Sequence, residues 1–113
     1  MEKIRPVSSA IGGAPAAIVL LVEPRGTQYG EFWIQDASAA MENMLLAAVA
    51  MGYGGCWVEG QIRTHEEQLC EILGVPDSLR VWSLTPIGTP AGEPTRPPKS
   101  AVEKVVHHNR FGG

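Results

Sequence analysis

The stretch that decides the fold runs from Asp36 to Gly60 and reads DASAAMENMLLAAVAMGYGGCWVEG. It has no charged residue between Glu42 and Glu59, and small or apolar side chains lie on every side of the helix that it predicts. A helix that faces water keeps one polar side, whereas a helix that is apolar all round is enclosed by protein or lipid. A chain of 113 residues has little material for this cover, so we expect a second molecule to supply part of it.

The predicted helix takes Asp36 as its N-cap and ends before Gly52. The aspartate side chain would accept hydrogen bonds from backbone N–H groups two or three residues on, and its charge suits the positive end of the helix dipole. The glycines between residues 52 and 55 predict a turn, and residues 56–58 predict a short strand that ends at Glu59.

One strand is expected before this helix, and a helix and a strand after it. Residues 15–22 read PAAIVLLV and predict a strand covered on both faces, while residues 23–30 predict an exposed loop. Residues 64–67 read THEE, match a capping box and predict a second, shorter helix that ends at Gly74. Residues 79–87 predict another strand.

The two ends of the chain differ from this middle part. Residues 1–13 show no periodicity and are expected to be an irregular segment, whereas residues 14–113 are expected to form one domain. Four prolines between residues 90 and 98 predict an extended arm, and residues 100–103 match a second capping box that predicts one helical turn. The fold class is therefore α+β: a small sheet with a central apolar helix, a second shorter helix and an extended C-terminal arm.

Composition excludes several classes of protein. Apolar residues make up 44% and charged residues 19%, which is ordinary for a soluble globular protein and too apolar for a disordered one. A net charge of −3 without a basic block argues against non-specific nucleic-acid binding. No leader peptide or membrane-spanning run is recognisable, so we expect a cytoplasmic protein. Cys56 and Cys70 have no CxxC spacing and predict reduced thiols in the core.

Residues of catalytic type are few. His65 lies inside the capping box, where a solvated position at a helix start is the expected role. His107 and His108 are adjacent, so their side chains would point apart in a strand and could not hold one metal ion. The chain has no nucleophile elbow, no dinucleotide-binding glycine motif after a strand and no phosphate-binding loop.

Two features suit a flat, phosphorylated ligand. Gly60 after Glu59 allows backbone N–H groups to approach such a ligand closely. Arg96 and Lys99 lie on the proline-rich arm, whose rigid backbone could aim them at a phosphate. The alternative is that Glu59 is merely exposed and that the charges of the arm are solvated.

The order of these elements resembles the flavin-dependent nitroreductase family over residues 14–111. The motifs that carry the resemblance are ENMLLAA at 42–48, GYGGCW at 52–57, LGVP at 73–76 and IGTP at 87–90. Each motif is weak alone, and their common order makes the resemblance specific.

The resemblance implies an intertwined homodimer that binds FMN at its interface and passes two electrons from NADH or NADPH to nitroaromatics, quinones or related acceptors. The flavin then carries the redox chemistry, so no catalytic side chain and no metal are expected. Val58, Glu59 and Gly60 are implied to lie with their backbone against the flavin ring near N5 and O4. A basic residue of the arm, Arg96 or else Lys99, is implied to help hold the FMN phosphate.

The resemblance also implies a role for the apolar helix of residues 36–51 at the dimer interface. On this basis we expect that a second subunit mainly covers the following side chains: Met41, Met44, Leu45, Ala48 and Met51.

The chain departs from the family pattern in two respects. The family's N-terminal half, with its Arg-x-Ser-x-Arg and Pro-Ser-x-x-Asn-x-Gln-Pro elements, has no counterpart here, and Glu42 stands where the family usually has glutamine. Three functions follow: an FMN-dependent oxidoreductase, a truncated or degenerate domain that dimerises without flavin catalysis, and a module on the same scaffold that binds another small ligand or a partner. FMN uptake by the purified protein discriminates between the first function and the other two.

Overall fold

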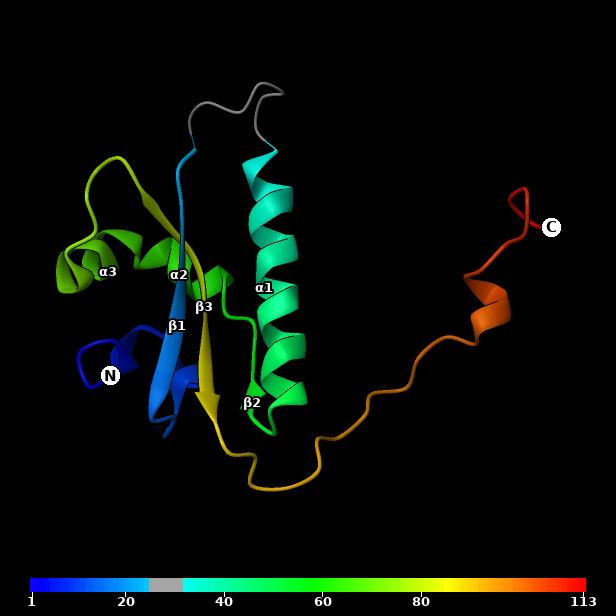
Figure 1. Ribbon diagram of the computed structural model, residues 1–113, viewed down its shortest axis with the longest axis horizontal. Helices are drawn as coiled ribbons and strands as arrows, with labels where there is room; N and C mark the ends of the chain where they lie inside the picture. The colour runs from blue at the N-terminus through cyan, green and yellow to red at the C-terminus, as the bar shows by residue number, and fades with distance from the viewer. Residues whose placement is uncertain (25–31) are drawn as a thin grey trace.

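The structure is a computed structural model that describes residues 1–24 and 32–113 (Figure 1). The loop predicted at residues 23–30 lies mostly outside this range. The elements in chain order are η1 (Arg5–Val7), η2 (Ser9–Ile11), β1 (Ala16–Val22), α1 (Trp33–Ala50), β2 (Gly54–Gly55), α2 (Gly60–Thr64), α3 (Glu66–Leu73), β3 (Arg80–Gly88) and η3 (Val102–Lys104). The α+β class predicted from the sequence is confirmed.

The sheet has the order β1-β3-β2, and both neighbours pair with β3 in antiparallel orientation. The central strand β3 is almost wholly buried, as expected for a strand that receives cover from both sides. The strand β1 lies at an edge, and Ile18 on it is 44% exposed, so the prediction that this strand is covered on both faces is wrong for this chain. The strand predicted at residues 56–58 is also wrong: β2 lies just before it, and only Val58 makes an isolated bridge, to Leu84.

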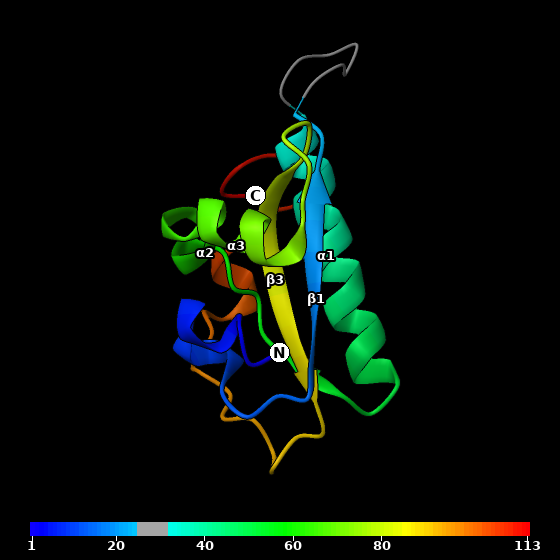
Figure 2. The same ribbon diagram turned by 90° about the vertical axis from the view of Figure 1, so that its left-hand side faces the viewer.

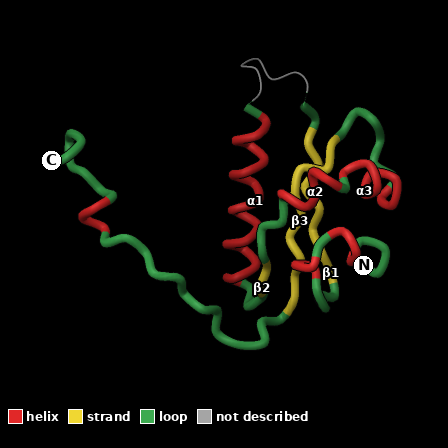
Figure 3. The backbone as a smooth tube through the Cα atoms, turned by 180° about the vertical axis from the view of Figure 1, so that it is seen from behind, coloured by secondary structure: helices red, strands yellow, loops and turns green. Residues whose placement is uncertain are grey.

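Helix α1 covers one face of the sheet, and α2, α3 and the N-terminal segment cover the other (Figures 2 and 3). The hydrophobic core lies on the second side. Its buried members come from the N-terminal segment, the approach to α2, both short helices and β3; they are Ile4, Val7, Ile11, Val58, Ile62, Leu69, Val81 and Leu84. The segment expected to be irregular thus contains two 3-10 turns and supplies three core residues, because Ile4, Val7 and Ile11 face the sheet and the short helices.

Helix α1 begins four residues earlier than predicted. Phe32 occupies the N-cap position without a side-chain hydrogen bond, and Asp36 lies in the first turn. The prediction of Asp36 as N-cap is therefore wrong, although its carboxylate still lies near the positive end of the helix dipole. The predicted end is confirmed: Met51 caps the helix, and Gly52 follows with φ +83°, a backbone conformation that favours glycine.

The capping box predicted at residues 64–67 does not form. Thr64 is the last residue of α2, a helical turn that the sequence analysis missed, and its hydroxyl donates to the Gln61 carbonyl oxygen. His65 takes the N-cap position of α3 without a side-chain cap. The end of α3 at Gly74, with φ +65°, is confirmed.

The C-terminal arm leaves the end of β3 and runs past the α1 side, away from the sheet (Figure 1). Residues 89–106 are all exposed, and the turn predicted at 100–103 appears as η3 without a side-chain cap. The surface area is 8268 Å², whereas a compact monomer of this mass exposes about 6000 Å². The radius of gyration of 17.1 Å likewise exceeds the roughly 13 Å expected for a compact chain of this length.

Within the described residues, none of the helices combines the length and the hydrophobicity needed to cross a lipid bilayer.

Candidate functional site

The predicted ligand-binding segment 58–60 lies where the chain leaves the sheet and enters α2. Val58 is 5% exposed and exchanges two backbone hydrogen bonds with Leu84, each 2.9 Å from N to O. The chain just before Val58 is held close to β3 at Gly55, where a Cβ atom would lie 2.7 Å from Thr85 Oγ1. That same Oγ1 accepts a hydrogen bond of 3.2 Å from the Cys56 N–H. This strand-to-helix junction therefore has a defined backbone position.

Three successive backbone N–H groups at the junction have no acceptor in the described part of the chain. Among the residues that the structure describes, none accepts a hydrogen bond from the N–H of Glu59, Gly60 or Gln61. Gly60 is exposed, and a Cβ atom built on it meets no atom within 4 Å. The junction thus presents three successive donors and an open Cβ position at Gly60, which suits an acceptor-bearing ligand that approaches the backbone.

Two contacts hold α2 behind these donors. Ile62 is completely buried in the core. The Ser8 hydroxyl, which is buried, donates a hydrogen bond to the Gln61 side-chain oxygen and accepts one of 3.2 Å from the Ala10 N–H. The N-terminal segment therefore fixes the position of the helix that follows these N–H groups.

A charged pair flanks the same junction. Glu59 Oε1 lies 3.1 Å from Arg63 Nη2 one helical turn later. The Arg63 guanidinium also lies over the Trp82 ring, 4.8 Å from its centroid, and Trp82 in turn packs edge-on against Trp33 at 5.0 Å between centroids. A cation above an indole face is attracted by the ring quadrupole, so this arginine has two partners that orient it.

The structure does not bring Arg96 and Lys99 to the junction. Both are exposed on the arm, and neither forms an ion pair with the part of the chain that the structure describes. The arm runs past the lower end of α1 and away from the sheet, whereas α2 packs on the sheet face opposite α1 (Figures 1 and 2). Of the predicted site residues, Val58, Glu59 and Gly60 lie together, and the two basic residues lie apart from them.

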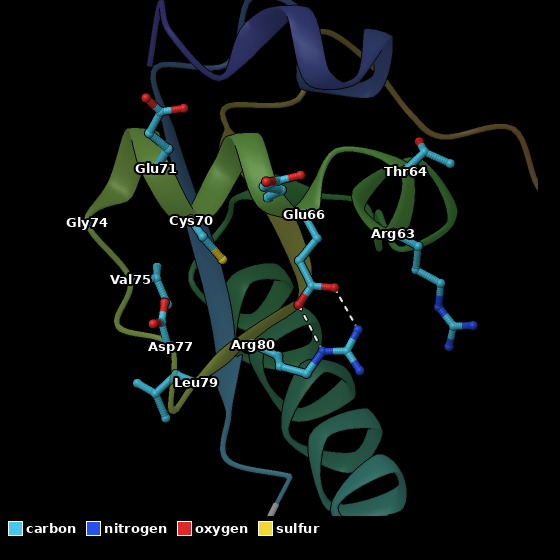
Figure 4. A pocket seen from close by; sticks show the side chains of 11 residues that line it. Arg63, Thr64, Glu66, Cys70, Glu71, Gly74, Val75, Asp77, Leu79 and Arg80 are labelled. Carbon is cyan, nitrogen blue, oxygen red and sulfur yellow. Dashed lines mark hydrogen bonds and ion pairs between the residues drawn. The ribbon is translucent and has the colours of Figure 1, made fainter.

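A hollow distinct from the junction adjoins α3. It measures about 890 Å³ and lies between α3 and the start of β3 (Figure 4). Glu66 and Arg80 form a double hydrogen bond across it, with distances of 3.0 Å and 2.7 Å. The Arg80 hydrogen bond lowers the pKa of Glu66 below its usual value, and burial opposes this effect. The pair satisfies itself, so this wall of the hollow offers a ligand little unmatched charge.

The remaining candidate residues form no centre. Cys56 and Cys70 are both free, but Cys56 is exposed, so its prediction as a core thiol is wrong. Within the described ranges, the structure contains no group of three or more histidine, cysteine or acidic side chains placed to hold a metal ion.

Sequence reasoning missed Ser8, Arg63 and Trp82. Ser8 gives no local signal because its partner Gln61 is distant in sequence. The i,i+4 spacing of Glu59 and Arg63 is a helical ion-pair signal, but it is readable only once α2 is recognised.

A sequence model described as the Nitroreductase family matches residues 6–89. A protein of Archaeoglobus fulgidus, provisionally named NADH dehydrogenase/NAD(P)H nitroreductase, is 40% identical over 71% of this chain and 47% of its own length. The FMN reductase (NADPH) of Bacillus subtilis is 33% identical over 67% of this chain and 30% of its own length.

Solved structures agree with this match. The structure of an FMN-dependent nitroreductase from Clostridium difficile superposes on 97% of this chain and 70% of its own chain, with a TM-score of 0.73 and 29% identity. The chain spans about half the length of the first curated relatives it matches, with 47% and 50% of their lengths covered.

Proposed function

We propose that this chain, which belongs to the nitroreductase family, acts as an FMN-dependent NAD(P)H oxidoreductase. The observation that carries the proposal is that the N–H groups of Glu59, Gly60 and Gln61 have no acceptor among the described residues, next to an open Cβ position at Gly60. A bound FMN would supply the redox chemistry by accepting two electrons from a nicotinamide and passing them to an acceptor. Nitroaromatics, quinones and similar compounds are the proposed acceptors.

The residues present fit one part of this cofactor. The flavin ring carries acceptor atoms at N5 and O4, and the junction offers adjacent N–H donors without competing partners among the described residues. The absence of a Cβ atom at Gly60 leaves room for a flat ring against the backbone. Val58 and Ile62 are buried on either side of these residues, so the donors are held by the core.

The phosphate requires residues from outside this part of the chain. Arg96 and Lys99 are the proposed phosphate ligands, and they lie on an arm that extends away from the junction. An arm with this course reaches a second subunit more readily than its own α2. We therefore infer that the site is shared within a homodimer, where the arm of one subunit approaches the junction of the other.

The outer side of α1 supports such an association. Leu46, Val49 and Met51 are 60%, 69% and 68% exposed, and Tyr53 just beyond the helix is 44% exposed. Large exposed apolar side chains that lie close together in the chain, as these four do, are a feature of interaction sites in soluble proteins. The residues differ in part from those predicted, because Met41 and Ala48 are 0% and 5% exposed and are already covered by their own chain.

FMN uptake by the 113-residue chain tests the proposal. The chain is incubated with FMN, freed of unbound cofactor, and its visible absorbance is measured. We expect a yellow protein with flavin bands. A colourless protein after this treatment contradicts the function and favours a domain that dimerises without flavin. The homodimer and the cytoplasmic location stay predictions until association and localisation are measured.

The Gly60→Val variant tests the site itself. It places a branched side chain where the flavin ring would lie, so we expect FMN uptake to be abolished. The fold should remain, because no described residue other than its chain neighbours lies within 4 Å of the new Cβ position. Gly13→Val is the matched control, since Gly13 is also exposed with no atom within 4 Å. Unchanged FMN affinity in Gly60→Val would refute the assigned site.

A further inference from the structure

Arg63 has contacts that the proposed function leaves unexplained. It is the basic residue next to the junction 58–60, and it comes from α2 rather than from the arm. Its guanidinium is held from two directions, by the Glu59 carboxylate at 3.1 Å and by the Trp82 ring at 4.8 Å. Trp82 is 6% exposed, so it forms a fixed base for the arginine.

The neighbouring charges leave Arg63 available to Glu59. Glu66 is the other carboxylate nearby, but Arg80 satisfies it with two hydrogen bonds. Arg63 is only the last and smallest of the influences that lower the pKa of Glu66. Figure 4 shows the Arg63 guanidinium separate from the Glu66–Arg80 pair.

The charge of Glu59 would oppose the reduction of a bound flavin. Its carboxylate belongs to the segment proposed to lie against the flavin, and two-electron reduction of a flavin adds negative charge to the ring at neutral pH. A carboxylate beside the ring without a counter-charge opposes that reduction by Coulomb repulsion. A cation paired with the carboxylate removes most of this penalty.

We propose that Arg63 is a positioning residue that neutralises the Glu59 carboxylate beside the flavin-binding segment and so favours the reduced form of the bound flavin. This inference rests on the proposed FMN site and adds a residue that sets its potential. The Arg63 side chain is 60% exposed, so the effect is partly screened by water and salt.

The test measures the midpoint potential of FMN bound to the 113-residue chain, by equilibration with a reference dye under anaerobic conditions. In Arg63→Ala we expect reduced FMN to bind about fivefold more weakly relative to oxidised FMN, which is a shift of about 20 mV to more negative potential. The shift should shrink at high salt, because exposed charges are screened. Arg63→Lys keeps the charge and should retain part of the effect.

A double variant separates charge from structure. In Glu59→Gln/Arg63→Ala both charges are absent, so the potential should return toward that of the unaltered chain. A merely structural role for Arg63 would not be rescued in this way. Arg80→Ala is the matched control, because it breaks a comparable ion pair away from residues 58–60.

The outcomes are distinct. An unaltered chain that takes up no FMN overturns the proposed function together with this inference. A chain that binds FMN but has the same potential in Arg63→Ala overturns the inference alone. Equal shifts in Arg63→Ala and Arg80→Ala, or no rescue in the double variant, also overturn it.

Discussion

The two sides of the sheet differ in what covers them. On the side of α2 and α3, the core residues are at most 5% exposed, and all of their cover comes from this chain. On the side of α1, the helix buries Ala37, Met41 and Ala48 but exposes large apolar side chains on its outer surface. The α2–α3 side is a hydrophobic core that this chain covers completely, whereas helix α1 is covered on its inner face only.

This difference indicates which side of the sheet stabilises the single chain and which side is available for assembly. Burial of a large aliphatic side chain contributes about 1.5–3 kcal/mol relative to exposure. The α2–α3 side gains this contribution within one chain, while the outer surface of α1 gains it only when another molecule binds. We therefore expect substitutions on the two sides to change different measurable quantities.

The largest effect, on the free energy of unfolding, is expected in the α2–α3 core. Leu84 is completely buried at the centre of β3, so Leu84→Ala leaves a cavity beneath both short helices. We expect the free energy of unfolding to fall by about 2–5 kcal/mol, measured by urea denaturation. Leu46→Ala is the matched control and should cost little at low protein concentration, because Leu46 is 60% exposed in the single chain. Equal losses in the two variants would mean that the two sides do not differ as described.

The second-largest effect is expected on the dissociation constant of the dimer. Leu46→Asp places a charge on the outer surface of α1, and burial of an unpaired charge in an interface is costly. We expect the dimer dissociation constant to rise about 100-fold or more, which corresponds to about 2.7 kcal/mol or more, measured by analytical ultracentrifugation.

The control for this experiment lies on the opposite side of the sheet. Leu73 on α3 is 42% exposed, and Leu73→Asp should leave the association unchanged. A dissociation constant unaffected by Leu46→Asp, or an unaltered chain that is monomeric at all concentrations, would contradict the assignment of this surface.

The sequence predicted the elements that have a strong local signal. The apolar run of β1, the glycine end of α3 and the proline-rich arm were all located correctly because each depends on neighbouring residues. The apolar character of α1 also predicted an incomplete cover. The sequence could not show which side chains of α1 face the sheet, because alanine and methionine lie on every side of the helix. Tertiary packing decided that Met41 lies inward and Met51 outward.

The errors occurred where a distant contact outweighs a local motif. The capping box at 64–67 is a valid local pattern, but burial of Ile62 draws residues 60–64 into α2 and uses Thr64 within it. Residues 58–60 were singled out by the family resemblance, and their role stays a prediction. The contacts of Ser8 and Trp82 with the start of α2 gave no sequence signal, since those residues meet it only through the fold.

The smallest effect on stability is expected at the rim of the α2–α3 core, where the Glu66–Arg80 pair joins the start of α3 to the start of β3. The Arg80 hydrogen bond holds the pKa of Glu66 below its usual value near 4.5. A lowered carboxyl pKa stabilises the folded state above the unfolded-state value, and this contribution is lost as the pH falls through the folded-state pKa. Because the Arg80 side chain is 50% exposed, we expect the pair to contribute less than about 1 kcal/mol.

Comparison of the unaltered chain with Glu66→Gln measures this contribution. The difference in the free energy of unfolding should be constant between about pH 6 and 8 and should decrease steadily below the usual carboxyl value. Glu71→Gln, on the same helix, forms no ion pair with any described residue and should give a difference that does not follow this course. A constant Glu66→Gln difference down to strongly acidic pH would mean that Arg80 does not stabilise the charged carboxylate. The rim would then contribute only through packing, and the contrast between the two sides of the sheet would rest on apolar burial alone.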